Sequence, residues 1–380
     1  MKDFTRRSFG SLLAGGILAS GLPNFASAET SSATPPLIID ALGGIDDANR
    51  YMSDDPFASR SLTLSARGIE DALSSGLNAV NVTLGYVAGD KDPFEHTIRD
   101  IAQWDAAIRQ HSDKLLKVFT ASDIELARKS GRIGIIFGFQ NAAQVGDNPD
   151  RVDIFGDLGV KIIQLTYNNK NQIGCGAVVQ TDTGLSDFGR EVIARLNEKQ
   201  ILVDVSHGGP KTITDAIKHS KTPITISHTG CRALADLPRN VDDKTLRMLA
   251  DRGGVAGIYF MPFLNKGPQP YAEAVVRHIE HAVNVAGEDH VGIGTDNSVT
   301  GIDDMPAFKA KIRKEVAERA KLGVSAPGES GDIVPLIPDL QGPDKYRKLI
   351  RLLEQRGHST GRIEKIMGGN FYRLMKEVWV

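Results

Sequence analysis

The sequence of 380 residues contains only two cysteines, Cys175 and Cys231, so a disulfide framework is excluded and at most one bridge can form. Whether these two thiols pair stays open. The formal net charge is only −2, which indicates no strong electrostatic surface for nucleic acid or for an anionic membrane. No apolar run reaches the ~20 residues of a transmembrane helix. We therefore expect a small soluble substrate, no nucleic-acid partner and no membrane anchor in the mature chain.

The N-terminal residues have the pattern of a twin-arginine export signal. Arg6 and Arg7 stand directly before the apolar run 12–22, which is too short and too rich in Gly and Ala to span a bilayer. The small residues 26–28 then form a cleavage pattern, so the mature chain is expected to begin near Glu29. The alternative is a basic tail before a buried helix. We expect residues 1–28 to be a signal peptide and the product to be periplasmic or secreted.

Short β-branched apolar runs alternate with segments of helical periodicity, which indicates βαβ units around a parallel sheet. Eight such runs are the number of strands in a (β/α)8 TIM barrel, and about 350 residues suit that fold. We therefore predict one barrel domain over residues 29–380. The eight predicted strands are 37–40, 79–84, 133–139, 162–166, 201–205, 223–227, 254–258 and 291–294, with an accessory ninth at 115–119.

Between the strands, Ser186 is a plausible N-cap, and Phe188, Val192 and Leu196 follow on one helical face that should lie against the barrel. After the last strand, residues 325–343 collect Pro, Gly, Ser and Asp, which predicts a long loop able to cover the barrel mouth. Terminal helices are then expected over 344–355, from a cap near Thr360, and over 371–378 after the interrupting Gly368 and Gly369.

Two similar strings, DVSHGG around His207 and TISHTG around His228, each place a Ser-His pair directly after an apolar strand. In a barrel both imidazoles would lie at the C-terminal rim, where barrel active sites occur, and neutral imidazole is the commonest metal ligand. The alternative is a pair of hydrogen-bonded rim residues. Asp296, in VGIGTDNS, stands at the end of the last strand. A carboxylate there could be a proton carrier or a metal ligand, and the alternative is a turn former. Arg239, in LPRNVDD, could clamp a substrate carboxylate.

These strings, VDVSH, ISHTG, RNVDD, VGIGTD and the closing GGNFYRLM, resemble the membrane (renal) dipeptidase family over nearly the whole mature chain. The resemblance implies a metallo-dependent (β/α)8 barrel, often dimeric, that hydrolyses dipeptides, including ones with a C-terminal D-residue, with two zinc ions bridged by a glutamate. It also implies that His207 and His228 are ligands of the second zinc. On the same pattern Arg239 binds the substrate carboxylate, and Asp296 handles protons at the peptide nitrogen.

The departures from the family pattern fall at its chemical centre. The family's DGHND string, whose His and Asp hold the first zinc, corresponds here to DALGG, with Leu42 and Gly44 at those two places. The bridging Glu corresponds to Gln140 in FGFQNA, and a His that orients the substrate corresponds to Tyr167 in LTYNN. Asp46 and Asp47 are near enough in sequence to swing back from the first loop.

This loss of carboxylates argues against two metal ions. Two divalent cations ~3.5 Å apart repel by roughly 20 kcal/mol even at an effective dielectric of 20, and bridging anions must offset that repulsion. Leu42, Gly44 and Gln140 supply no negative charge. We therefore predict one zinc, held by His207, His228 and either Gln140 or Asp296.

Other polar residues have simpler interpretations. His278 and His281 lie at i, i+3 on a predicted helix, a spacing that can bind metal but that is more typical of a solvated face. His290 precedes the last strand, which places it at the opposite barrel end in a structural role. Asp54 and Asp55 are expected to be turn residues rather than catalytic carboxylates.

The leading hypothesis is a periplasmic dipeptidase-like hydrolase in which one activated water attacks the peptide carbonyl, Asp296 shuttles the proton, Arg239 holds the carboxylate and Tyr167 orients the carbonyl or its oxyanion. The first alternative is a non-catalytic barrel that captures peptides through Arg239. The second is a related enzyme that performs a non-hydrolytic step on a peptide metabolite.

Overall fold

The computed structural model describes residues 35–50 and 63–380. The predicted signal peptide, its cleavage site and the pair Asp54 and Asp55 lie outside the described residues. Among the described residues, no helix combines the length and the apolar character that crossing a membrane demands.

Eight parallel strands form the barrel, as the sequence predicts. Their order in the sheet is β1 (Ile39–Gly43), β2 (Ala79–Thr83), β4 (Ile133–Phe139), β5 (Val160–Gln164), β6 (Leu202–Asp204), β7 (Thr225–Thr229), β8 (Val255–Ile258) and β9 (Val291–Ile293). The predicted accessory strand is β3 (Leu115–Lys117), which pairs only with β4. The two ends of the sheet meet where Asp296 N donates to Leu42 O (2.7 Å) and Gly44 bridges to Ser298.

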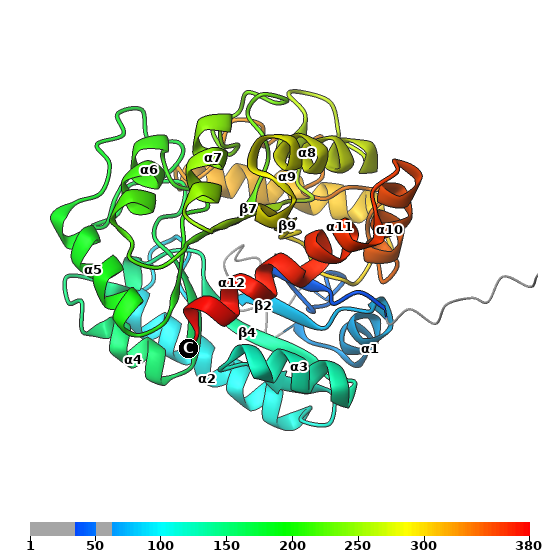
Figure 1. The fold of residues 1–380 in the computed structure, drawn as a ribbon, viewed down its shortest axis with the longest axis horizontal. Coiled ribbons are helices and arrows are strands. Elements are labelled where there is room, and N and C mark those ends of the chain that lie inside the picture. The colour runs from blue at the N-terminus through cyan, green and yellow to red at the C-terminus, as the bar shows by residue number, and fades with distance from the viewer. Residues whose placement is uncertain (1–34, 51–62) are drawn as a thin grey trace, which may run out of the picture. The chain divides into compact units, whose positions relative to one another are not determined.

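Helices follow the strands and cover the outside of the sheet (Figure 1). They are α1 (Ala66–Ser75), α2 (Pro93–Gln110), α3 (Ala121–Ser130), α4 (Arg151–Asp157), α5 (Asp187–Glu198), α6 (Pro210–His219), α7 (Asp243–Asp251), α8 (Ala272–Ala286), α9 (Met305–Lys321), α10 (Lys345–Gln355), α11 (Thr360–Glu364) and α12 (Asn370–Val378). Shorter helical turns are η2 (Ala143–Val145), η3 (Pro262–Leu264), η4 (Glu288–His290) and the π-helical η5 (Lys365–Gly369).

The predicted start of α5 is confirmed, because the Ser186 side chain accepts a hydrogen bond from Gly189 N (2.9 Å). Val192 and Leu196 are buried against the barrel, and Phe188 packs beside them. By contrast, the apolar pattern does not predict α9. Eight of the 17 residues of this helix are charged, and Ile312 is its only buried residue.

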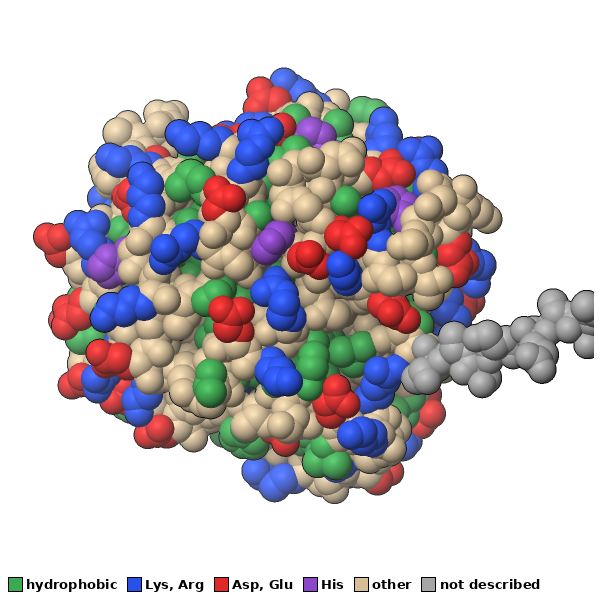
Figure 2. All heavy atoms as spheres, viewed as in Figure 1, with side chains coloured by type: hydrophobic (Ala, Val, Ile, Leu, Met, Phe, Trp, Pro, Cys, Tyr) green, Lys and Arg blue, Asp and Glu red, His purple; other side chains and the backbone are tan. Residues whose placement is uncertain are grey.

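The terminal helix α12 closes the N-terminal end of the barrel, where it crosses the strands in the centre of Figure 1. Phe371, Leu374 and Met375 join the inward-facing strand residues in one apolar cluster. Gly368 permits this contact, because a Cβ there would lie 2.5 Å from the carbonyl oxygen of Leu37. The face seen in Figure 2 carries basic and acidic side chains interspersed, with no large area of one sign.

Both cysteines are buried free thiols. Cys231 Sγ contacts the carbonyl oxygen of His278 (3.4 Å), and burial raises the pKa of Cys231 to about 12. In this structure the disulfide that the sequence left open is not formed.

Candidate functional site

A cavity of about 330 Å³ opens at the C-terminal ends of the strands, the barrel end at which active sites form. Tyr167 follows β5, Gln140 follows β4 and Asp296 follows β9, and all three line the cavity. Residues of α9 and of the predicted 325–343 loop line it from outside the sheet. The prediction of a long loop over 325–343 is therefore confirmed, and this loop forms part of the cavity wall.

The two predicted histidines lie together at this end of the barrel. His207 follows β6 and His228 lies within β7, and their ring centroids are 4.9 Å apart. Both side chains are buried. The ring of Tyr167 stacks on His207 at 4.3 Å, so Tyr167 lies between the cavity and this imidazole.

Hydrogen bonding fixes the tautomer of His207. The Asn168 amide nitrogen donates to Val324 O (2.7 Å), which leaves the Asn168 Oδ1 oxygen facing His207 Nδ1 at 2.6 Å. Because an amide oxygen only accepts, Nδ1 must carry the proton. His207 Nε2 is therefore a lone-pair acceptor, and it is buried with no hydrogen-bond partner among the described residues.

A buried carboxylate fixes His228 in the same way. The Ser227 hydroxyl donates to Asp204 Oδ2, so its oxygen is free to accept from His228 Nδ1 at 2.8 Å. Asp204 also accepts from the backbone and hydroxyl of Ser206 (2.9 and 2.8 Å). His228 Nε2 is thus a second lone-pair acceptor, again buried and without a partner in the described chain.

Both imidazoles are neutral at ordinary pH. Burial lowers the pKa of His207 and of His228 well below the usual value, and the guanidinium of Arg239 lowers both further. A neutral imidazole with Nδ1 protonated offers the Nε2 lone pair that a metal ion or a ligand N–H group needs.

Arg239 is a buried cation close enough to act electrostatically on both histidines. Its guanidinium lies 5.8 Å from the ring of Tyr259 and 6.0 Å from the ring of Phe263. No carboxylate in the described part of the chain pairs with it. A buried guanidinium without a counter-ion is costly, and a ligand carboxylate would remove that cost.

Arg319 and Glu329 are site residues that the sequence did not single out. From α9, Arg319 donates to the hydroxyl oxygen of Tyr167 (3.1 Å) and to both carboxylate oxygens of Glu329 (2.8 and 3.0 Å). Although burial opposes it, the interactions with Tyr167 and Glu329 raise the pKa of Arg319. Solvated arginines on charged helices look the same in sequence, so no local signal identifies this one.

Asp296 and Gln140 lie at the cavity but in different surroundings. Asp296 has a positive φ of 56°, and His207 one of 59°; only one other non-glycine residue of the described chain, Gln200, shares this conformation. Backbone strain of this kind concentrates at functional sites. The Gln140 amide nitrogen donates to Thr83 Oγ1 (2.8 Å).

Gly44 follows the first strand and lies against the Asp46 side chain. Leu42 is buried, and a Cβ at Gly44 would lie 2.3 Å from Asp46 Oδ1. The Asp46 carboxylate therefore occupies the space that a side chain at position 44 would need. Asp46 and Asp47 both line the cavity.

The site fits one metal ion only in part. The two buried Nε2 atoms suit two ligand positions, since an imidazole lone pair without a partner is a typical zinc donor. However, the described residues contain no group of three or more His, Cys, Asp or Glu side chains that could hold a metal ion. Asp296 is thus not assembled with the histidines as a third ligand, and the residues do not fit a two-ion centre.

The remaining histidines have structural roles. The expectation of a solvated face was wrong for His278, which is buried: Nδ1 accepts from Cys231 N (2.9 Å) and Nε2 donates to Leu264 O (3.0 Å). Burial lowers the pKa of His278 to about 4. His281 pairs with Asp243 (2.7 Å), and His290 donates to Gly254 O (2.8 Å) at the N-terminal end of β9.

A family model described as membrane dipeptidase (peptidase family M19) matches residues 69–322 of the chain. The chain is also 30% identical over 272 residues to the dipeptidase tcpJ of Claviceps purpurea, a match that covers 70% of this chain and 56% of that protein. It thus spans little more than half the length of this relative.

Two solved structures are similar over nearly the whole fold. An amidohydrolase from Pseudomonas aeruginosa is 30% identical with a TM-score of 0.76, covering 90% of this chain and 97% of that one. A metallopeptidase from Rhodobacter sphaeroides, solved with a phosphinate mimic of the dipeptide L-Ala-D-Ala, is 17% identical with a TM-score of 0.72, covering 90% and 99%. The second likeness shows the fold alone.

Proposed function

Because the chain belongs to the membrane dipeptidase family, whose metallopeptidase members imply a metal cofactor, we propose that it hydrolyses dipeptides at the mouth of the barrel with one metal ion. The observation that carries this proposal is the pair of neutral imidazoles, His207 and His228, whose buried Nε2 lone pairs have no partner in the described chain. A metal ion would supply the partner that these two acceptors lack.

Substrate binding is assigned to Arg239. Its buried guanidinium has no counter-ion among the described residues, and a planar guanidinium binds a carboxylate with two parallel hydrogen bonds. The substrate is therefore a peptide with a free C-terminal carboxylate. Tolerance of a C-terminal D-residue is part of this proposal, and the Rhodobacter relative was solved with a mimic of such a dipeptide.

His207 and His228 would hold the metal ion, for which zinc is the natural choice, and Gln140 is the proposed further protein ligand. The chemistry that such an ion supplies is Lewis-acid polarisation of the peptide carbonyl. The chain's own residues orient these ligands. Asn168 and the pair Asp204 and Ser227 keep both Nε2 atoms unprotonated.

Proton transfer is assigned to Asp296, which lines the same cavity as Tyr167. A carboxylate there takes a proton from the attacking water and delivers it to the departing amine nitrogen. Tyr167, held by Arg319, orients the carbonyl and donates to its developing oxyanion.

The test is to purify the exported protein, measure metal per chain and assay a panel of L,L and L,D dipeptides together with their C-terminal amides. We expect about one ion per chain and hydrolysis of the free dipeptides only. Neither bound metal nor turnover on any dipeptide would reject the proposal.

A second function is supported by a different observation, namely that no group of three metal-ligating side chains lies in the described chain. On this alternative the barrel captures peptides through Arg239 without cleaving them. Calorimetry separates the two: simple binding gives heat that saturates at one peptide per chain, whereas hydrolysis gives heat that continues with each turnover.

We also propose that the chain is exported by the twin-arginine route, with Arg6 and Arg7 as the recognition pair. Replacing both arginines with lysine should leave the full-length precursor in the cytoplasmic fraction, whereas the wild type should be recovered from the periplasm beginning near Glu29. Equal recovery of both proteins from the periplasm would reject this route.

A further inference from the structure

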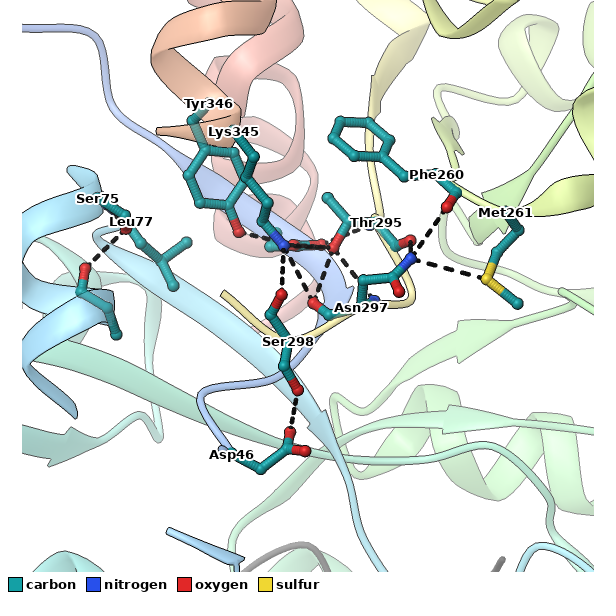
Figure 3. Close-up of polar contacts among 12 residues, drawn as sticks. Asp46, Ser75, Leu77, Phe260, Met261, Thr295, Asn297, Ser298, Lys345 and Tyr346 are labelled. Atoms are coloured by element: carbon teal, nitrogen blue, oxygen red, sulfur yellow. Dashed lines mark hydrogen bonds and ion pairs between the residues drawn. The ribbon is translucent and has the colours of Figure 1, made fainter. Parts of the chain in front are cut away.

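A second cluster of buried charges lies where the first and last strands meet. Lys345, the first residue of α10, is buried with its ammonium 3.9 Å from Asp40 of β1. Figure 3 shows this side chain reaching from its helix to the loop that follows β9. The mechanism proposed above makes no use of Lys345.

The Lys345 ammonium has a complete set of acceptors. Nζ donates to Thr295 Oγ1 (3.1 Å), to Asn297 O (3.1 Å) and to Ser298 O (3.3 Å). Three donors thus meet three acceptors, so this lysine is neither a free nucleophile nor an open anion site. All three acceptors belong to the 295–298 loop, and they flank Asp296 on both sides.

Asp40 holds the same loop from the other direction. Its carboxylate accepts from Thr295 N (2.7 Å), from Thr295 Oγ1 (2.6 Å) and from the Tyr346 hydroxyl (2.8 Å). Asp296 N, the next amide, donates to Leu42 O. The loop is therefore tied to β1 and to α10 at successive residues.

Stability alone does not account for this arrangement. A buried ion pair is often no more stabilising than apolar residues of the same volume, so burying Lys345 and Asp40 needs another reason. Asp296, between the anchored residues, has a left-handed backbone (φ 56°) that a non-glycine residue adopts at a cost in free energy. Such strain persists only where the surroundings over-determine the conformation.

We propose that Lys345 is a positioning residue, which holds the 295–298 loop so that the Asp296 carboxylate is presented to the cavity. The catalytic part of this inference rests on the proposed function, because Asp296 is the proton carrier there. The structural part, that the ammonium keeps the loop in its strained conformation, stands without any assumption about activity.

The experiment compares Lys345→Met, which removes the ammonium but keeps the apolar stem, with Tyr346→Phe. The second variant removes a donor to the same Asp40 carboxylate and leaves every contact of the loop intact, so it is a matched control. Hydrogen exchange of the Asp296 and Val299 amides, which donate to Leu42 O and Gly44 O, reports the loop directly. We expect exchange about tenfold faster in Lys345→Met and near wild type in Tyr346→Phe.

The link to catalysis is tested by a double-mutant cycle with Asp296→Ala on the best dipeptide. Lys345→Met should lower kcat about a hundredfold with little change in KM, and it should have almost no further effect once Asp296 is alanine. Additive losses would show that Lys345 does not act through Asp296. Unchanged amide exchange would overturn the inference as a whole.

Two outcomes are kept apart by this design. If the wild type cleaves no dipeptide, the proposed function fails while the exchange measurement still decides whether Lys345 holds the loop. If Lys345→Met leaves Asp40 unpaired and does not fold, the variant Asp40→Asn/Lys345→Met removes both charges and is compared with Asp40→Asn alone.

Discussion

Two buried polar clusters lie at the same end of the barrel and differ in how far their hydrogen bonds are satisfied. At the junction of β1 and β9, Lys345 has three acceptors and Asp40 has three donors. At β6 and β7, the Nε2 atoms of His207 and His228 have no partner within the described residues. The Arg239 guanidinium, buried in the loop after β7, has no carboxylate partner among the described residues.

This difference indicates that one cluster has a structural role and the other binds a ligand. Leaving a buried polar group unsatisfied costs about 1–3 kcal/mol, and more for a charged one, so a ligand that supplies the missing partner recovers that free energy. The complete cluster around Lys345 fixes backbone and needs nothing further. The incomplete cluster around the histidines is where a metal ion and a carboxylate would bind.

The largest expected effect comes from the incomplete cluster. His228→Ala should lower kcat/KM for dipeptides about a thousandfold or more and abolish metal binding, because it removes one of two imidazole donors. His281→Ala is the matched control, since that histidine pairs only with Asp243. Retained metal in His228→Ala would contradict the assignment.

Arg239→Leu should separate binding from stability. We expect KM for free dipeptides to rise about a hundredfold, because the guanidinium that pairs with the substrate carboxylate is lost. The unliganded protein should unfold at a higher temperature than the wild type, since an unpaired buried charge has been removed. A lower unfolding temperature would mean that Arg239 is already compensated without ligand.

Asp204→Asn tests whether the support behind His228 matters to the ligand. Losing the carboxylate releases the Ser227 proton and, with it, the preference for the Nδ1–H tautomer, so metal affinity should fall about 10- to 100-fold. Asp182→Asn is the control, because this carboxylate caps α6 through Lys211 N (2.6 Å) without contacting a histidine. Equal metal affinity in both variants would exclude the role.

The complete cluster predicts a pH effect. Burial lowers the pKa of Lys345 to about 8, although Asp40 and Asp46 oppose the shift. Between this value and the ordinary 10.5, the unfolded chain binds more protons than the folded one, so raising the pH favours folding. From pH 8 to 10 the wild type should gain about 2 kcal/mol relative to Lys345→Met in denaturant titrations. Parallel pH profiles would indicate an ordinary lysine pKa.

The smallest effect belongs to a residue outside both clusters. Ser186→Ala removes the N-cap of α5 and should cost about 1 kcal/mol of unfolding free energy. Dipeptide kinetics should stay unchanged, because α5 lies on the outer face of the barrel. A change in kcat would show that the outer helices influence the site more than the two clusters suggest.

Much of the fold could be predicted because apolar periodicity is local. The strand 133–139 is predicted to the residue, since all seven side chains of β4 are buried and β-branched or apolar residues fill it. The first strand is predicted over 37–40, whereas β1 spans Ile39–Gly43. The prediction stops at Asp40 because a carboxylate is typical of a strand end, but Asp40 is buried within β1. Its partners Thr295, Lys345 and Tyr346 lie more than 250 positions away in the chain, and their contacts make a carboxylate acceptable there.

The candidate site was predictable only in part. The Ser-His strings after two strands place His207 and His228 at one rim, because parallel strands share their carboxyl end. The residues that hold the site side chains in place could not be predicted. Asn168, Arg319 and Glu329 act through contacts between segments that are distant in the sequence. The prediction for His278 was wrong because it too depends on distant segments. Its helical spacing suggested an exposed face, whereas its ring is buried and bonded to Cys231 and Leu264.

The amino-acid order by itself determined the alternation of strands and helices, the family membership and the rim position of the two histidines, because each depends on residues close together in the chain. Tertiary structure alone decided which buried polar groups find partners and which are left for a ligand. Hydrogen-bond satisfaction depends on atoms brought together from distant segments, and sequence patterns do not record those distances.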